Sequence, residues 1–164
     1  MRNIRLIILH CSATPEGQDF SVEDIDRWHR KRGFNCIGYH WVVYRDGSVH
    51  PGRPEEMVGA HCKGYNQHSI GVCYVGGLRP LTPLPKDKTE GDGSTARAHV
   101  THNRPVTMVG GRPYVAADTR TPEQRRAMRK LVGELLRRYP HSTVHGHYEY
   151  ANKACPCFNA KTEL

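Results

Sequence analysis

Two short apolar runs constrain the fold of this 164-residue chain more than any other feature. The run NIRLIILH, residues 3–10, is rich in leucine and isoleucine and indicates a buried β-strand. The run SIGVCYVGG, residues 69–77, is apolar on both faces, so we expect a strand at the centre of a sheet. Both runs are far too short to cross a bilayer. The sequence therefore predicts a water-soluble domain built around a buried sheet.

The segment SVEDIDRWHRKRG, residues 21–33, predicts the first helix. Ser21 is a typical N-cap, acidic residues occupy the first turn, basic residues occupy the last, and Gly33 ends the pattern. Trp28 and His29 fall on the apolar side of the helix. We interpret both as packing residues.

The segment TRTPEQRRAMRKLVGELLRRYP, residues 119–140, predicts the longest helix. Thr121 is the expected N-cap, with Pro122 at the first helical position, where proline is favoured. Its expected inner face consists of Met128, Leu131, Leu135 and Leu136.

The remaining regular elements are short strands. YHWVVYRDGSVHPGR, residues 39–53, alternates and turns on Asp46-Gly47, which indicates a hairpin, and STVHGH, residues 142–147, predicts a strand ending at a histidine. The order strand, helix, strands, helix, strand is typical of an α/β domain. We predict a single domain over residues 1–164, with a mixed central sheet flanked by helices.

The segment from Leu78 to Ala117 differs in composition, because it is dense in proline, glycine, threonine and charged residues. We interpret residues 78–117 as a surface insertion, which could hold a short hairpin around VTMVGGRPYV, and not as a second domain. His99 and His102 stand three residues apart within it. Because no third ligand lies near them in the sequence, we do not expect a second metal site there.

The formal net charge of +8 favours polyanions in general, nucleic acid and an anionic cell wall alike. No zinc-finger spacing, RNA-binding signature or basic stripe interleaved with aromatic residues is visible, so we expect no specific nucleic-acid binding. We also expect no membrane insertion and a monomer. The N-terminus lacks the pattern of a secretory signal, which predicts that the chain as synthesised is cytoplasmic.

Six cysteines raise the question of a disulfide framework, which is typical of small secreted chains. In a cytoplasmic protein of this size, buried reduced thiols are the more common arrangement. We expect that state for Cys11, Cys36, Cys62 and Cys73.

Three possible metal ligands lie at or just beyond the ends of predicted strands, namely His10, His147 and Cys155. Zinc accepts imidazole nitrogen and thiolate sulfur, and a catalytic site uses three protein ligands. The spacing alone leaves alternatives open, because a structural histidine is the commoner fate of any one histidine, and KACPCF could be an unrelated thiol pair.

Four segments carry a more specific signal: ILHCSAT (8–14), IGYHWVVYRDGSVHPGR (37–53), VGAHCKGYNQHSIGVCYVGG (58–77) and HGHYEYANKACPCF (145–158). In this order they resemble the zinc-dependent N-acetylmuramoyl-L-alanine amidases of type 2. The likeness is greatest to the short phage lysozymes of that group, and peptidoglycan recognition proteins are more distant relatives. The resemblance implies their α/β fold and covers most of the chain outside residues 78–117.

The resemblance implies roles for individual residues. His10, His147 and Cys155 correspond to the zinc ligands, with one Zn²⁺ per chain, and Tyr39 and Lys153 correspond to catalytic residues of the phage enzymes. Larger cytoplasmic amidases have a glutamate where this chain has Cys73, so its task should fall to Tyr39 here.

The segment AHCKGYNQHS, residues 60–69, resembles the lip of the substrate site. His61 and Asn66 could hydrogen-bond the muramyl or stem-peptide groups, although a plain polar loop would have the same composition. His145 is a lesser candidate ligand, because a regular strand would turn it away from the site.

The implied reaction is hydrolysis of the amide between the lactyl group of N-acetylmuramic acid and L-alanine in peptidoglycan. Zinc would lower the pKa of a bound water towards about 7 and polarise the carbonyl. Lys153 could stabilise the oxyanion, and Tyr39 could orient the water or pass a proton to the departing amine.

Two other functions remain possible at the level of sequence. A non-catalytic wall-binding module is disfavoured by the intact ligands. An additional role in inhibiting an RNA polymerase is known among phage lysozymes of this kind. Access to the wall could come through phage lysis, and a wall-recycling enzyme or a toxin exported by a secretion machine fits the sequence equally well.

Overall fold

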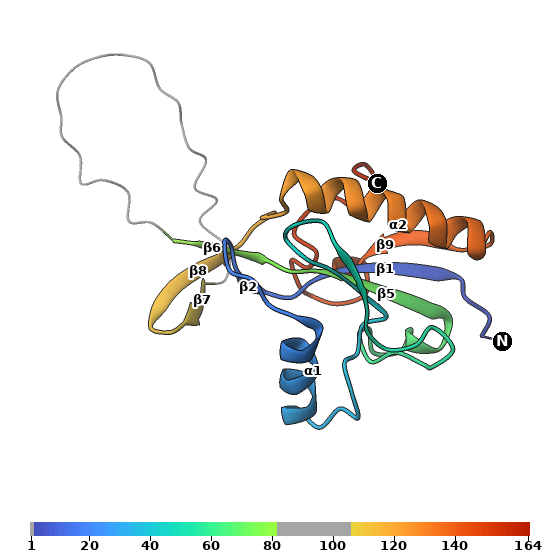
Figure 1. The fold of residues 1–164 in the computed structure, drawn as a ribbon, viewed down its shortest axis with the longest axis horizontal. Coiled ribbons are helices and arrows are strands. Elements are labelled where there is room, and N and C mark those ends of the chain that lie inside the picture. Colours follow the sequence, from blue (N-terminus) through green and yellow to red (C-terminus); the bar gives the residue numbers. More distant parts are fainter. Residues whose placement is uncertain (1, 82–105) are drawn as a thin grey trace, which may run out of the picture.

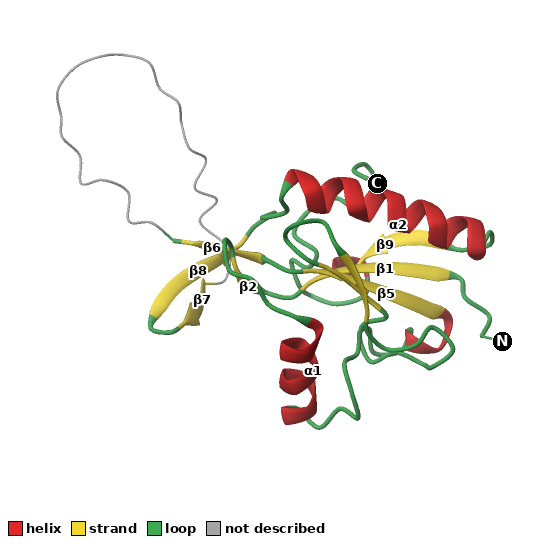
Figure 2. Ribbon diagram, in the orientation of Figure 1, coloured by secondary structure: helices red, strands yellow, loops and turns green. Residues whose placement is uncertain are grey.

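The computed structural model describes residues 2–81 and 106–164. Its centre is a five-stranded mixed sheet with the strand order β4-β3-β5-β1-β9 (Figures 1 and 2). Its strands are β1 (Leu6–Cys11), β3 (Trp41–Val43), β4 (Val49–Pro51), β5 (Ser69–Tyr74) and β9 (Thr143–Gly146). The predicted α/β class and central mixed sheet are confirmed.

The two apolar runs form adjacent central strands. β1 pairs in parallel with both β5 and β9, and β5 also pairs in parallel with β3. β4 alone is antiparallel, as the partner of β3 in the hairpin that turns on Asp46-Gly47. Every residue of β5 is buried, as a strand covered on both faces requires.

The two helices begin and end close to the predicted residues. α1 (Val22–Lys31) is capped by Ser21, whose hydroxyl accepts a hydrogen bond from the backbone N–H of Asp24. α2 (Pro122–Arg138) is capped in the same way by Thr121 and Gln124. Each helix has a reciprocal capping box, in which side chains at both ends of the first turn satisfy free backbone N–H groups.

The helices cover opposite faces of the central sheet, α2 on one and α1 on the other (Figure 1). Ile7, Leu9 and Cys11 of β1 pack with the buried face of α2 in the larger core. Because side chains alternate along a strand, Ile8 and His10 point to the opposite face. The first candidate ligand therefore lies on the α1 side of the sheet.

A second sheet, with the order β2-β6-β8-β7, extends from one end of the first (Figure 2). Its strands are β2 (Thr14–Pro15), β6 (Gly77–Pro80), β7 (Val106–Val109) and β8 (Arg112–Ala116). The hairpin predicted around VTMVGGRPYV is thus present as β7 and β8.

The ends of the 78–117 segment are not a simple surface loop, which corrects the sequence interpretation for these residues. Leu78, Tyr114 and Ala117 are buried, and β8 pairs with β6 as well as with β7. Composition could not reveal this pairing, because it joins residues far apart in the sequence. His99 and His102 lie outside the described residues.

Candidate functional site

The three candidate ligands converge at one edge of the central sheet. His10 is near the carboxyl end of β1, and His147 follows the carboxyl end of the parallel neighbour β9. Carboxyl ends of parallel strands meet at one edge, which is where α/β sheets place ligands. Cys155 arrives in the following loop, and one ligand atom from each residue lies within 4.8 Å of the others.

The donor set and its spacing fit zinc. Two imidazoles and one thiolate are the three protein ligands of a catalytic zinc site, with the fourth position open. Tetrahedral Zn–S and Zn–N bonds would separate sulfur from nitrogen by about 3.6 Å. The Cys155 Sγ lies 3.8 Å from the His10 Nδ1. The residues present can therefore hold such an ion with little rearrangement.

The two sulfurs of KACPCF have different surroundings. The Cys155 Sγ faces His10 and accepts a hydrogen bond from the backbone N–H of Cys11 at 3.2 Å. The Cys157 Sγ lies 3.8 Å from the Cys11 Sγ and 3.6 Å from the Gly77 carbonyl oxygen. Only the first sulfur belongs to the ligand group. Cys11, Cys62 and Cys73 are buried reduced thiols as expected, whereas Cys36 is partly exposed.

The imidazoles of the site are held in their neutral form. Burial lowers the pKa of His10 well below its usual value, and the neighbouring His61 and His147 lower it further. Burial also lowers the pKa of His147, and the nearby positive charge of Lys153 adds to the effect. A neutral imidazole is the form that binds a metal.

Tyr39, two residues before β3, lies against His10, with ring centroids 5.1 Å apart. The buried thiol of Cys73 lies close enough to it that Tyr39 affects the pKa of this thiol. Burial raises the pKa of Tyr39 well above its usual value, and the thiols of Cys73 and Cys155 raise it further. The phenol is therefore protonated at neutral pH.

Beside the three ligands lies an open cleft of about 500 Å³, called the cleft below. Tyr39, His147 and Lys153 line it, and Lys153 is exposed. The other residues that line it are His29, Arg32, Phe34, Ala60, His61, Cys62, Lys63, Gly64, Asn66, Tyr150 and Ala151. A larger hollow of about 1010 Å³ lies near Arg2 and the C-terminal end of α2, but none of the three candidate ligands lines it.

His61 and Asn66, expected to contact substrate, both line the cleft and also have protein partners. His61 is only 8% exposed, and its ring contacts His10 and Ser69. The side-chain oxygen of Asn66 accepts hydrogen bonds from the backbone N–H groups of His61 and Cys62. Both residues border the cleft, but these contacts shape its wall and leave His61 without a free ring nitrogen.

His145 lies outside the ligand group. Its Nδ1 contacts the Glu149 carboxylate at 3.0 Å, and its Nε2 contacts the Thr143 hydroxyl at 2.8 Å. The alternation argument against it was wrong, because a regular strand places residues 145 and 147 on the same face. His145 is separated from the ligand group because β9 ends at Gly146 and because Thr143 and Glu149 hold its ring. His29 and Trp28 pack as expected: His29 is buried, and Trp28 is partly buried in the smaller core beside α1.

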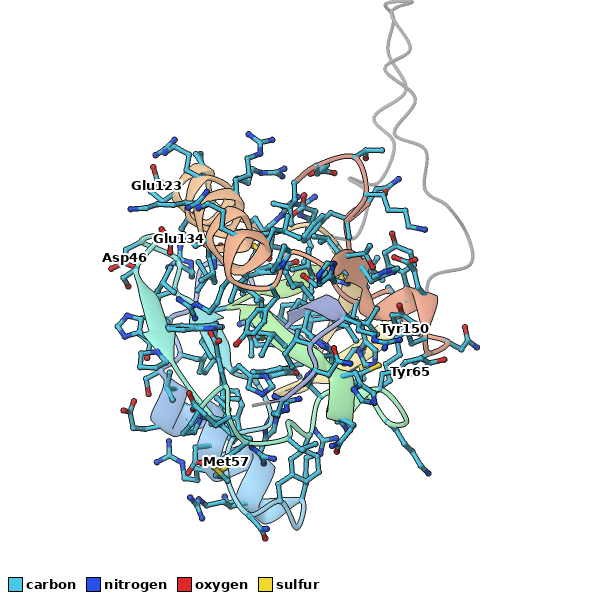
Figure 3. All side chains as sticks on the ribbon, turned by 90° about the vertical axis from the view of Figure 1, so that its right-hand side faces the viewer. Asp46, Met57, Tyr65, Glu123, Glu134 and Tyr150 are labelled. Carbon is cyan, nitrogen blue, oxygen red and sulfur yellow. The ribbon has the colours of Figure 1, made fainter. Side chains whose placement is uncertain are left out.

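Sequence reasoning missed several residues of the cleft. Arg32 and Lys63 add positive charge beside Lys153. The rings of Tyr65 and Tyr150 contact each other beside the cleft, with centroids 4.2 Å apart (Figure 3). An aromatic or basic residue in a loop carries no periodic signal, so only the fold could bring these residues together.

Comparisons with known proteins agree with the geometry. The family described as N-acetylmuramoyl-L-alanine amidase matches residues 1–158. The endolysin of Escherichia phage T7 is 37% identical over 155 residues, which is 94% of this chain and 82% of the relative. Peptidoglycan-recognition protein LB of Drosophila melanogaster is 37% identical over 76 residues, covering 46% of this chain and 32% of that protein.

Solved structures share the fold. N-acetylmuramoyl-L-alanine amidase LysC from Clostridium intestinale superposes with a TM-score of 0.66 at 22% identity, covering 96% of this chain and 79% of that one. Drosophila PGRP-LB superposes with a TM-score of 0.62 at 20% identity, covering 95% of this chain and 76% of that one. The family match over nearly the whole chain, together with the phage endolysins, shows that this chain belongs to the N-acetylmuramoyl-L-alanine amidase family and is a peptidoglycan amidase.

Proposed function

We propose that this amidase uses one zinc ion, held by His10, His147 and Cys155, to hydrolyse the bond between N-acetylmuramic acid and L-alanine. The observation that carries the proposal is the convergence of these three side chains beside an open cleft. When bound there, zinc supplies a water of lowered pKa, towards about 7, and a Lewis acid for the scissile carbonyl.

Tyr39 orients the reacting groups. A phenol whose pKa is raised by burial neither gives up nor takes a proton readily at neutral pH, but it still donates a hydrogen bond. Its contact with His10 places it beside the ligand group. Without a metal the phenol therefore orients the reacting groups, and the positive charge of a bound zinc would lower its pKa towards the proton transfer that the sequence also proposes.

Lys153 stabilises negative charge on the carbonyl oxygen. It lies two residues before Cys155, lines the cleft, and its charge is close enough to lower the pKa of His147. An ammonium at this position interacts more strongly with the charged transition state than with the neutral amide, which is the condition for a catalytic contribution.

The rim of the cleft fits an acidic ligand. Arg32, Lys63 and Lys153 all line it, and the described residues that line it include no aspartate or glutamate. Peptidoglycan stem peptides carry carboxylates, so this rim favours binding of the peptide next to the scissile amide. The ring of Tyr150 offers a flat apolar surface at the same rim.

We further propose that the chain acts as a monomer in phage-type lysis, without specific nucleic-acid binding. Four phage endolysins are among its relatives, which supports this role. No helix among the described residues is long and apolar enough to cross a membrane.

Metal analysis combined with a wall-clearing assay tests the proposal. Purified protein should carry about one zinc per chain, chelation should stop the clearing of a cell-wall suspension, and added zinc should restore it. A chelated protein that still clears the suspension, with no bound ion by metal analysis, would refute the zinc mechanism. Wall binding without any clearing would instead indicate a binding module.

A further inference from the structure

The ring of His10 makes a separate contact on each of its two nitrogens. Its Nδ1 faces the Cys155 Sγ at 3.8 Å, on the side of the ligand group. Its Nε2 lies 3.0 Å from the Nδ1 of His61, on the side of the protein interior. The two rings meet edge to face, with centroids 5.0 Å apart.

The second ring nitrogen of His61 also has a polar partner. The Nε2 of His61 lies 3.2 Å from the hydroxyl of Ser69, the first residue of β5. Ser69 is fully buried, His10 is 1% exposed, and His61 is 8% exposed. A line of three buried polar side chains therefore leads from the ligand group into the core.

Two glycines make room for the His61 ring. A methyl group at Gly59 or at Gly71 would come within 2.6 Å of ring atoms of His61. Gly71 lies in β5 opposite Ile8 of β1, so the ring sits directly against the central strands. Because these two positions have no side chain, the ring packs closely against their backbone and is held in one orientation.

We propose that His61, supported by Ser69, is a positioning residue for His10. It fixes the tautomer and orientation in which the His10 Nδ1 is free to bind zinc. This inference rests on the proposed zinc site.

The order of the protons follows from which nitrogen binds the metal. A metal-binding Nδ1 carries no proton, so the His10 proton is on Nε2, which donates to the Nδ1 of His61. The proton of His61 is then on its own Nε2, which donates to the Ser69 hydroxyl. Both ring nitrogens of His10 and both of His61 have a partner in this arrangement, as buried polar groups require.

The size of the effect can be estimated from other metal sites. Removing the partner that holds a metal-binding histidine costs about 10- to 100-fold in metal affinity or activity. We therefore expect a loss in this range when the His61 acceptor is removed, with all three proposed ligands still in place.

The test measures the zinc Kd of the metal-free protein by competition with a chromophoric chelator. His61→Phe keeps a ring in the space but removes the acceptor, and should weaken zinc binding about 10- to 100-fold. His61→Asn restores an acceptor oxygen near the position of Nδ1 and should bind zinc more tightly than His61→Phe.

The control is His29→Phe, the same change at another buried histidine, whose Nδ1 accepts a hydrogen bond from the Gly38 N–H. It should lose stability but keep the wild-type zinc Kd. The absorption spectrum of the cobalt-substituted protein gives a second readout, which should change in His61→Phe and not in His29→Phe.

The outcomes separate this inference from the proposed function. A wild-type protein that binds no zinc refutes the zinc site itself. A wild-type protein that binds zinc, with an equal Kd and cobalt spectrum in His61→Phe, overturns only the role of His61. If His61→Phe does not fold, His61→Leu, which also removes the acceptor, takes its place, and an unchanged Kd and spectrum there overturns the proposal equally.

Discussion

Two cysteines that lie two positions apart have different tasks. Cys155 faces His10 and accepts the N–H of Cys11, whereas Cys157 faces the Cys11 thiol and the Gly77 carbonyl. The intervening Pro156 is buried, and its carbonyl oxygen accepts a hydrogen bond from Tyr74. The loop is thereby anchored so that one sulfur points to the ligand group and the other to β1.

This difference gives the first prediction. Cys155→Ser should abolish activity and weaken zinc binding, because a hydroxyl is a much poorer zinc ligand than a thiolate. Cys157→Ser should keep both near wild type. Zinc content and wall clearing, measured side by side for the two variants, check this. Equal losses in both would mean that the ligand loop is not held as described.

The second prediction separates catalysis from metal binding. Tyr39→Phe and Lys153→Ala touch no proposed ligand, so both should keep about one zinc per chain. Each should lose on the order of 10²-fold in kcat, the range for a positioned polar group or an oxyanion donor. A Tyr39→Phe variant with the wild-type rate would reduce Tyr39 to a packing residue.

The sequence could supply only part of the site. His10 and His147 were visible because they stand at the ends of apolar strands, and the resemblance selected Cys155 over Cys157. The role of His61 was not visible, because its partner His10 is 51 residues away and only the pairing of β1 with β5 brings them together.

At the scale of elements, local signals were reliable and distant pairings were not. Both helix starts were predictable because Ser21 and Thr121 are caps whose effect lies within one turn. The turn at Asp46-Gly47 was equally local. The pairing of β6 with β8 was missed, because it depends on residues that composition had assigned to one surface insertion.

The third prediction concerns residues 82–105, between β6 and β7. Leu81 and Val106 lie on opposite sides of β8, about 12 Å apart across two strand spacings and a stagger of two residues. A Gly-Ser linker of about six residues reaches up to about 20 Å and can join them. Replacing 82–105 with this linker should preserve the fold and the zinc content, because the paired strands β6, β7 and β8 and the three ligands all lie outside the replaced range.

Substrate preference should respond to this replacement if the segment contacts glycan, stem peptide or a partner. Circular dichroism, zinc analysis and hydrolysis of two wall types check the outcome. Loss of the fold on replacing 82–105 would show that the segment is structural. Replacing 80–116, most of the segment 78–117 that composition sets apart, would instead remove β7 and β8 and should destabilise the protein.

At the scale of the whole molecule, buried histidines predict how stability depends on pH. Burial lowers the pKa of His29 to about 4 and the pKa of His40 to about 4. In the unfolded chain both groups have a pKa of about 6.5. Between these values the unfolded state binds more protons, so the stability present above pH 6.5 is lost as the pH falls towards 4.

The fourth prediction is the slope of this loss. Each histidine should contribute roughly 1.4 kcal/mol per pH unit to the fall in unfolding free energy between about pH 6.5 and 4. Urea unfolding of metal-free protein at several pH values measures this slope. His29→Gln should reduce it by the contribution of one histidine, roughly 1.4 kcal/mol per pH unit. An unchanged slope in this variant would mean that His29 is protonated in the folded protein.

Hydrolysis of one particular amide bond should depend on a zinc ion at the edge of the central sheet, with the cleft beside it. Mass spectrometry of the soluble products from purified peptidoglycan, with and without prior chelation, tests it most directly. We predict stem peptides with a free N-terminal L-alanine and glycan with a free lactyl carboxyl group, both absent after chelation and present again after zinc is added. Products cut between sugars or within the stem peptide, or the same products from metal-free protein, would contradict it.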